Sequence, residues 1–325
     1  GIGTEGTVFE GDITFDSLDY MTLPKGTTTQ SNRGRGLNGG GNTGSLTARI
    51  DYLEIQTSGI TKDFGDLNEA KHYLASMASS TRGLFAGGGN PSDVNTINYV
   101  EIPTTGNALD FGDLQSARRG NAGCGSDTRG ISMGGRTPGN TDEIDYVTYA
   151  TIGNATDFGN LTAATRNTSS CSSPTRGLML GGTSSPADTN VIEYITIATA
   201  GNATDFGDLT DDRHAPAALS SNTRGVASGG YDGATKNLIE YVTIATTGNA
   251  TDFGDLIRIT NAGGSISNRT RGLFLGGNHP SSPNCSNIID LITISSTGNS
   301  IRFGDLYAGT YGCAGCSDSS GGLTE

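Results

Sequence analysis

The chain has 325 residues, a formal net charge of −13 and 51 glycines, but no tryptophan and only 16% charged residues. This acidic balance argues against nucleic-acid binding, because a phosphate backbone would be repelled, and no apolar run approaches the ~20 residues that a membrane-spanning helix needs. The abundance of Gly, Thr, Ser and Asn, with few helix formers, predicts many short strands joined by turns.

One sequence unit recurs along the chain. The pattern Arg-Gly-x-x-x-Gly-Gly returns at steps of 47 or 48 residues, followed each time by a strand-like run, usually around a tyrosine, and by DFGDL or a near copy. The pattern starts at Arg35, Arg82, Arg129, Arg176, Arg224 and Arg271. The phenylalanines of the DFGDL block are Phe64, Phe111, Phe158, Phe206, Phe253 and Phe303.

Each unit reads as four strands in chain order. In the unit around Arg176, NTSSCSS precedes the arginine, RGLMLGG is a short apolar run closed by two glycines, and TDFGDL ends in a tight glycine turn. The strand between the last two, VIEYITI, carries apolar residues on both faces and is therefore expected to be covered on both. Four strands in about 47 residues, with no helical period, predict one blade of a β-propeller.

The number of blades depends on the chain ends. Six units of 47 residues leave 43 over, which is nearly one more unit. Residues 310–325 match the strand before the arginine and, at residues 320–323, the start of the strand that follows it. Residues 6–18 contain Phe15 in a near copy of the FGDL block, preceded by GTVFEG as a further strand. We therefore expect an all-β chain in which residues 1–325 form a single seven-bladed β-propeller of four-stranded blades. Its last blade would be shared by residues 1–18 and 310–325, with a six-bladed ring with loose ends as the alternative.

These motifs resemble those of kelch-repeat propellers over nearly the whole chain. The shared features are the glycine pair that ends the second strand, the aromatic strand after a variable loop, and the period near 50 residues. Kelch repeats usually carry a tryptophan late in the unit, and here the Phe of DFGDL would take that packing role. The sequences of the repeats, such as TRGLFLGG and IEYVTIATTGNATDFGDL, also resemble those of uncharacterised propeller proteins of tailed phages. This second resemblance implies a virion or tail-fibre component and no particular activity.

The repeated polar residues are interpreted as structural. The double glycines allow close strand approach, and each repeated arginine is expected to pair with an aspartate of a DFGD turn as a strut. These aspartates are Asp66, Asp113, Asp208, Asp255 and Asp305. Their spacing lacks the alternating oxygen ligands of a calcium loop, so no metal is expected.

Three of the five cysteines are expected to be buried small hydrophobes. Cys124, Cys171 and Cys316 share one repeat position that is mostly apolar in the other units. Cys313 and Cys316 are three residues apart and would point to opposite faces of a strand, so neither a disulfide nor a zinc site is favoured.

Catalysis is not expected. The three histidines lie in different units, and no nucleophile–base constellation can be assembled from the sequence. No glycine-rich loop opens a helix, so no phosphate-binding motif and no cofactor are expected.

Recognition is expected on one face of the ring. The loops after the double glycines and the loops that join the blades share a face, and both sets vary in sequence, whereas the opposite face is monotonous. The candidate ligand-binding residues on the variable face are Lys71, His72, Arg118, Arg119, Arg213, His214, Tyr231 and His279.

Three functional hypotheses remain. The first is a non-enzymatic structural and adhesive module of a virion, tail fibre or other extracellular fibre, with fibre subunits and a host-surface glycan or protein as partners, and with homo-oligomers possible. The second is a kelch-like adaptor for protein–protein interaction. The third is a secreted glycan-active enzyme. The low charge and the Gly/Ser/Thr/Asn-rich surface favour the first.

Overall fold

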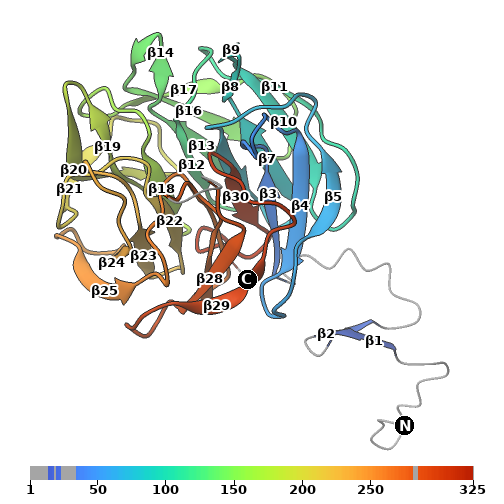
Figure 1. The fold of residues 1–325 in the computed structure, drawn as a ribbon. Coiled ribbons are helices and arrows are strands. Elements are labelled where there is room, and N and C mark those ends of the chain that lie inside the picture. Colours follow the sequence, from blue (N-terminus) through green and yellow to red (C-terminus); the bar gives the residue numbers. More distant parts are fainter. Residues whose placement is uncertain (1–13, 18–19, 23–33, 281–284, 325) are drawn as a thin grey trace, which may run out of the picture.

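Residues 34–280 and 285–324 build a ring of six four-stranded antiparallel sheets (Figure 1), and residues of the innermost strands line a central channel. The computed structural model describes residues 14–17, 20–22, 34–280 and 285–324. The predicted β-propeller of four-stranded blades is confirmed, whereas the predicted number of seven blades is wrong. No helix that is long and apolar enough to cross a bilayer occurs among the described residues.

The blades share one order of strands from the channel outwards. The innermost strands are β6 (Ala75–Ala78), β12 (Ala122–Gly125), β18 (Ser169–Ser172), β22 (Ala217–Ser220), β26 (Gly264–Ser267) and β30 (Ala314–Ser317). The second strands start at the repeated arginines: β3 (Arg35–Gly39), β7 (Arg82–Ala86), β13 (Arg129–Met133), β19 (Arg176–Ser184), β23 (Arg224–Ser228) and β27 (Arg271–Leu275).

The third strands are β4 (Arg49–Glu54), β10 (Thr96–Glu101), β16 (Glu143–Thr148), β20 (Ala187–Thr196), β24 (Leu238–Thr243) and β28 (Ile288–Thr293). The outer strands are β5 (Lys62–Asp66), β11 (Leu109–Asp113), β17 (Thr156–Asn160), β21 (Thr204–Asp208), β25 (Thr251–Asp255) and β29 (Ile301–Asp305). Short hairpins add β8 (Gly89–Asn90) with β9 (Ser92–Asp93), and β14 (Arg136–Thr137) with β15 (Gly139–Asn140).

The ring closes with six blades because the C-terminal strand completes the first blade. β30 pairs with β3, and Cys316 lies opposite Leu37, just as Cys124 lies opposite Ile131 within one unit (Figure 1). The strand that was assigned to a seventh blade is therefore the innermost strand that the first unit lacks. This pairing covers the free edge of β3, which an open ring would expose.

The predicted N-terminal share of a seventh blade is not found where it can be examined. β1 (Thr14–Ser17) pairs only with β2 (Tyr20–Thr22), and neither is hydrogen-bonded into a blade. The rest of residues 1–18, namely 1–13 and 18, lies outside the described residues.

Asp318 seals the junction between the two ends of the ring. In the other blades, the turn before the second strand is held by a Ser or Asn side chain that accepts the N–H of the following arginine, as Ser173 does from Arg176 at 3.1 Å. At the junction, Oδ1 of Asp318 accepts the N–H groups of Gly34 and Arg35 at 3.0 and 2.9 Å. The same turn thus forms between two segments that are far apart in the sequence. Burial raises the pKa of Asp318 to about 6.

A circle of backbone hydrogen bonds surrounds the channel. One residue just before each innermost strand donates its N–H to the carbonyl of its counterpart in the preceding blade, and the sixth bond returns to the first blade. The donor–acceptor pairs are Gly120–Tyr73, Asn167–Gly120, Ala215–Asn167, Ala262–Ala215, Gly312–Ala262 and Tyr73–Gly312, at 2.7 to 2.9 Å. The non-glycine members also have a positive φ, near 50°. This conformation turns both the N–H and the C=O towards the neighbouring blades.

The repeated arginines join neighbouring blades through backbone carbonyls. Nη1 of Arg176 donates to Ile244 O at 3.0 Å and to Ala245 O at 2.9 Å, both in the next blade. The other five arginines donate in the same way to backbone carbonyls of the following blade, and Arg271 completes the circle with a hydrogen bond to the first blade. The expected partner was wrong, because the Asp of the DFGD turn is not the acceptor. The strut role itself fits the geometry.

The GNATDFGD segment also proves to be a blade-to-blade contact. Phe206 is the extra residue of a β-bulge, is buried, and packs edge-on against Tyr194 with ring centroids 6.0 Å apart. The backbone N–H of Asp208 donates to Oδ1 of Asn249 in the next blade at 3.1 Å. A Cβ on Gly207 would lie 2.5 Å from the carbonyl oxygen of Gly248, so only glycine allows this approach.

The hydrogen bonds from Arg176 to backbone carbonyls predict different losses of stability for two substitutions in one blade. Replacing Arg176 by Ala removes two charge-assisted hydrogen bonds and should lower the free energy of unfolding by about 1–3 kcal/mol. Replacing Asp208 by Ala keeps its backbone N–H and should change stability by no more than about 0.5 kcal/mol. Chemical denaturation measures the free energy of unfolding of both variants. Equal losses would support the original expectation that the arginine pairs with an aspartate of the DFGD turn.

The junction at Asp318 predicts a specific pH dependence. Asp318→Asn keeps the acceptor oxygen, as Asn268 does in another blade, and should be more stable than Asp318→Ala by about 1–2 kcal/mol. Because the pKa of Asp318 is raised in the folded state, the folded state takes up a proton as the pH falls through about 6. The wild type should therefore gain stability relative to Asp318→Asn between pH 7.5 and pH 4.5. Denaturant titrations at both pH values measure this, and parallel pH curves would contradict it.

Candidate functional site

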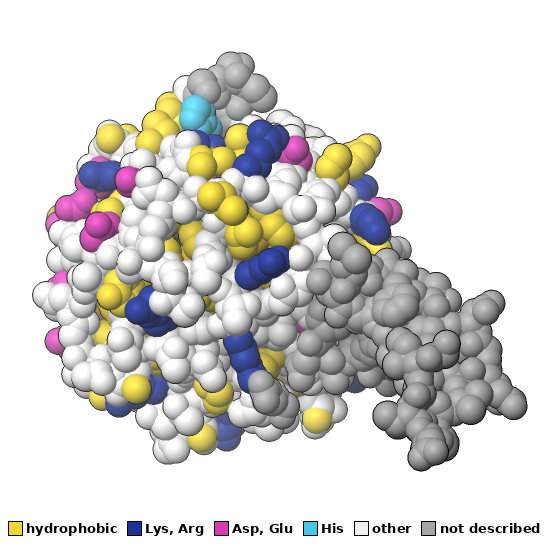
Figure 2. All heavy atoms as spheres, turned by 90° about the horizontal axis from the view of Figure 1, so that it is seen from below, with side chains coloured by type: hydrophobic (Ala, Val, Ile, Leu, Met, Phe, Trp, Pro, Cys, Tyr) yellow, Lys and Arg dark blue, Asp and Glu magenta, His cyan; other side chains and the backbone are white. Residues whose placement is uncertain are grey.

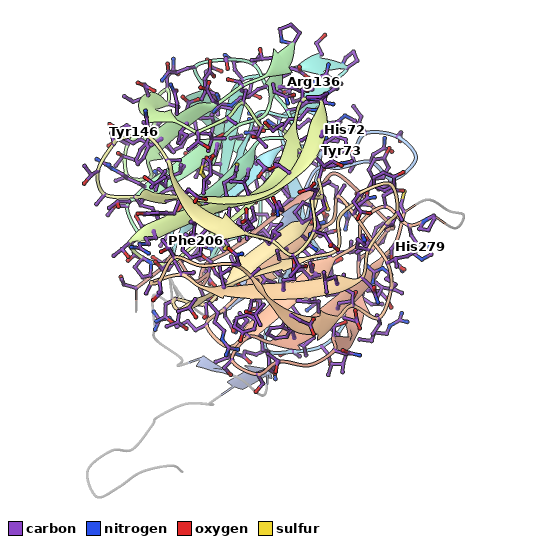
Figure 3. All side chains as sticks on the ribbon, turned by 90° about the vertical axis from the view of Figure 1, so that its left-hand side faces the viewer. His72, Tyr73, Arg136, Tyr146, Phe206 and His279 are labelled. Carbon is purple, nitrogen blue, oxygen red and sulfur yellow. The ribbon has the colours of Figure 1, made fainter. Side chains whose placement is uncertain are left out.

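The variable loops gather at one end of the ring. In a side view, His72, Tyr73, Arg136 and His279 lie towards one end, whereas Tyr146 lies towards the other (Figure 3). The first end holds the loops that follow the double glycines and the loops that join the blades, as the alternation of strand directions predicted. It is called the loop face below.

Three of the predicted ligand-binding residues are not on the surface of the loop face. The side chains of Lys71, Arg118 and Arg213 are fully buried, so their expected exposure was wrong. They occupy the same position in three blades, under the loops, where each side chain reaches the third strand of its own blade.

These buried cations serve polar groups of the core. Arg213 pairs with Glu240, which is itself fully buried. Arg118 binds Asp145 at 2.9 Å and also contacts Glu143. Nζ of Lys71 donates to Oγ1 of its neighbour Thr96 at 3.1 Å, and burial lowers the pKa of Lys71 to about 8. The cations therefore satisfy groups within the blades and leave the loop face to other side chains.

The opening of the channel on the loop face is framed by six backbone bridges. Each bridge joins two residues of one blade. One lies ten positions before the repeated arginine, or before Gly321, which takes its place at the C-terminus, and the other directly follows a double glycine. The bridged pairs are His72–Gly89, Arg119–Arg136, Arg166–Thr183, His214–Tyr231, Asn261–Asn278 and Tyr311–Asn42. These twelve residues, called the mouth ring below, occupy equivalent positions on a six-fold scaffold, yet their side chains differ from blade to blade.

The mouth ring is chemically asymmetric. Four consecutive bridges carry His72, Arg119, Arg136, Arg166 and His214, whereas the other two, Asn261–Asn278 and Tyr311–Asn42, carry only neutral polar and aromatic side chains. Arg119 pairs with Asp93 at 3.2 Å, and Nδ1 of His214 lies 2.9 Å from Oδ2 of Asp188. Burial and then the charge of Arg119 lower the pKa of His72.

Tyr73 is the one bulky residue in the circle of backbone hydrogen bonds. Its φ is 51°, and the equivalent positions hold Gly, Asn or Ala. A bulky side chain in this region of φ is a genuine outlier, and such strain concentrates at functional sites. Its ring centroid lies 4.8 Å from that of His72 and 6.3 Å from that of Tyr311. An aromatic cluster therefore stands at the edge of the channel.

A cavity of about 110 Å³ lies beneath the mouth ring, lined by Tyr73 and by small residues of the innermost strands.

The C-terminal segment crosses the other end of the channel. Arg269 of the sixth blade donates to Leu323 O at 3.2 Å, and Thr324 N donates to Asp127 of the third blade. Because these blades are opposite each other in a ring of six, the segment spans the opening.

The remaining predicted residues lie on the loop face. His72 and His214 belong to the mouth ring, as do Arg119 and Tyr231, whose side chain is 37% exposed. His279 follows the ring residue Asn278 and is half-buried. Sequence reasoning missed Tyr73, Arg136, Arg166 and Tyr311. An alignment of the units on their repeated arginines would have shown these residues at positions that vary from unit to unit. Arg136 lies seven positions after its arginine, Tyr73 nine before and Arg166 ten before, and Tyr311 is the equivalent of Arg166 at the C-terminus.

Within the described residues, metal-ligating side chains do not cluster, and four of the five cysteines are buried. Among the described residues, no group of three or more His, Cys, Asp or Glu side chains could hold a metal ion. Cys124, Cys171 and Cys316 are buried, as the sequence predicted, and Cys313 is buried as well. Burial raises the pKa values of all four thiols, for Cys124 to about 12. A thiol with such a pKa is a poor nucleophile at neutral pH.

The chain matches no protein-family model and no curated protein. The resemblances to kelch repeats and to phage propellers therefore gain no support from these comparisons, and the fold is shown at the level of a β-propeller with four-stranded blades. Such a fold is compatible with binding to a protein partner.

The buried pair of Arg213 and Glu240 yields a test of the structural role of the buried cations. Arg213→Ala leaves a buried carboxylate without a counter-charge and should destabilise the protein by about 3–5 kcal/mol. Replacing both residues, for example by Met and Leu, should recover most of that loss. Thermal and denaturant unfolding of the single and double variants measures this. A single variant of unchanged stability would return Arg213 to the list of ligand-binding candidates.

Proposed function

We propose that the propeller is a non-enzymatic adhesive module of a virion, tail fibre or other extracellular fibre, and that its loop face binds a host-surface glycan or protein. One observation carries the proposal. The polar residues that recur in every unit are engaged in contacts between blades, whereas the side chains of the mouth ring vary at equivalent positions. Variation on a constant scaffold is typical of recognition surfaces.

The side chains of the mouth ring and of the adjacent Tyr73 favour a glycan. Tyr73 and Tyr311 present an aromatic cluster beside amide and hydroxyl side chains such as Asn42 and Asn261. Small-molecule sites commonly combine apolar or aromatic walls with a few polar groups that fix orientation. The apolar face of a sugar ring can stack on a tyrosine while its hydroxyl groups bond to the amides.

The rim of the ring supports attachment to other subunits. Ile60, Ile301 and Tyr307 are 64%, 62% and 68% exposed, and Ile60 forms a bridge to Asp305, where the sixth and first blades meet. Figure 2 shows hydrophobic side chains gathered among lysines and arginines on the side of the molecule where β28 and β29 lie in Figure 1. Exposed apolar groups of this kind are typical of interaction sites, and the rim lies apart from the mouth ring.

Binding to host cells or to an array of glycans tests the proposal. Tyr73→Asn introduces the residue that another blade carries at this position, Asn167, and tolerates the positive φ. Combined with Tyr311→Asn, it should weaken binding at least tenfold, because both aromatic surfaces are lost. Tyr307→Asn removes an exposed tyrosine of the rim and should leave binding unchanged.

Other outcomes would change the assignment. Binding of a peptide without any glycan would favour a protein-interaction adaptor, and hydrolysis of a bound glycan would favour an enzyme. Immunogold labelling of the native source should place the chain on particles or filaments, whereas label spread through the cytoplasm would contradict a virion role.

A further inference from the structure

We infer that the mouth ring binds the anionic group of an acidic saccharide through Arg136 and Arg166. This inference rests on the proposed glycan-binding function and adds the chemical class of the ligand and the residues that select it.

Arg136 and Arg166 differ from the other arginines of residues 34–280 and 285–324. They are the two whose guanidinium groups make neither an ion pair nor a hydrogen bond, and their Nε atoms are buried without a partner. The others bind acidic side chains or backbone carbonyls, as Arg119 and Arg176 do. Neither guanidinium group has an acceptor among the described residues, so a ligand that supplies one to the Nη atoms gains charge-assisted hydrogen bonds.

The backbone brings the two arginines together. The N–H of Gly135, which precedes Arg136, donates to the carbonyl of Thr165, which precedes Arg166, at 2.8 Å. Arg136 is also bridged to Arg119 on its other side. Three arginines therefore follow one another along the mouth ring, and only Arg119 has a carboxylate partner. A local excess of positive charge in a chain of net charge −13 attracts anions to this place.

The chemistry of guanidinium defines the ligand class. Two guanidinium groups present planar donors that bind a carboxylate or a sulfate through paired hydrogen bonds. Beyond Arg119, the ring continues to His72 and the aromatic cluster with Tyr73, where a neutral sugar unit can stack. A saccharide that carries an anionic group on one unit and an apolar sugar face on another thus matches both parts of the ring.

Calorimetric titration of the purified chain tests this with defined oligosaccharides. The probes are oligogalacturonate for carboxylate, carrageenan oligomers for sulfate and maltohexaose as the neutral comparison, each at 50 and 300 mM NaCl. One or both acidic probes should bind at least tenfold more tightly than maltohexaose, and the higher salt should weaken that binding.

Substitutions locate the site. Arg136→Gln with Arg166→Gln should weaken binding of the acidic probe at least tenfold, with an unchanged melting temperature, because neither guanidinium has a partner in the free protein. Arg136→Lys with Arg166→Lys keeps the charge but not the fork and should fall in between. Lys62→Gln with Lys236→Gln removes the same charge outside the mouth ring and should leave binding intact.

The outcomes separate the two proposals. Maltohexaose bound as tightly as the acidic probes would overturn the anionic site and leave glycan binding standing. Acidic binding that survives Arg136→Gln with Arg166→Gln would overturn the assignment of these residues. Binding of poly-glutamate without any saccharide, or of none of the probes, would overturn this inference and the choice of a glycan.

Discussion

The closed circle of backbone hydrogen bonds around the channel is the constraint on which the rest of the molecule depends. Each blade donates to the preceding one, and the sixth bond returns from Tyr73 to Gly312 only if the blades complete a full turn. Contacts further out repeat the same step, through the arginine struts and through the Asn of the GNA turn. Because these links run from blade to blade, the geometry of one interface sets that of all the others.

This constraint divides the residues of each unit into two classes. Those engaged in blade contacts recur almost unchanged, down to glycines whose Cβ would meet a neighbouring carbonyl. The polar residue in the middle of the third strand is satisfied in different ways in different blades. Asp145 pairs with Arg118 and Glu240 pairs with Arg213, whereas Glu193 accepts the N–H of Thr162. Buried charge is thus balanced separately within each blade.

The mouth ring belongs to neither class. Its backbone is held by bridges that recur in all six blades, while its side chains are free to differ. The result is a symmetric frame in which four consecutive blades carry the arginines and histidines and the other two carry only neutral side chains. Such polarity suits a ligand that is itself asymmetric along its length, and it places Arg136 and Arg166 together without any requirement from the fold.

The sequence by itself determined the features that repeat within one unit. The four-stranded blade, the burial of Phe206 and Cys124, and the face on which the variable loops gather all follow from local periodicity and alternation. These features depend on contacts that recur every 47 or 48 residues, so each unit reports them again.

Only the tertiary structure decided how many blades close the ring and which groups meet across their interfaces. The strand Ala314–Ser317 reads equally well as the start of a new unit or as the missing strand of the first, and pairing with Arg35–Gly39 settles the choice because it leaves no open edge. Likewise, carbonyl and carboxylate acceptors for Arg176 look alike in sequence. The burial of Lys71, Arg118 and Arg213 could not be predicted either, because a loop cation becomes a core residue only when the loops and the third strand of its own blade pack around it.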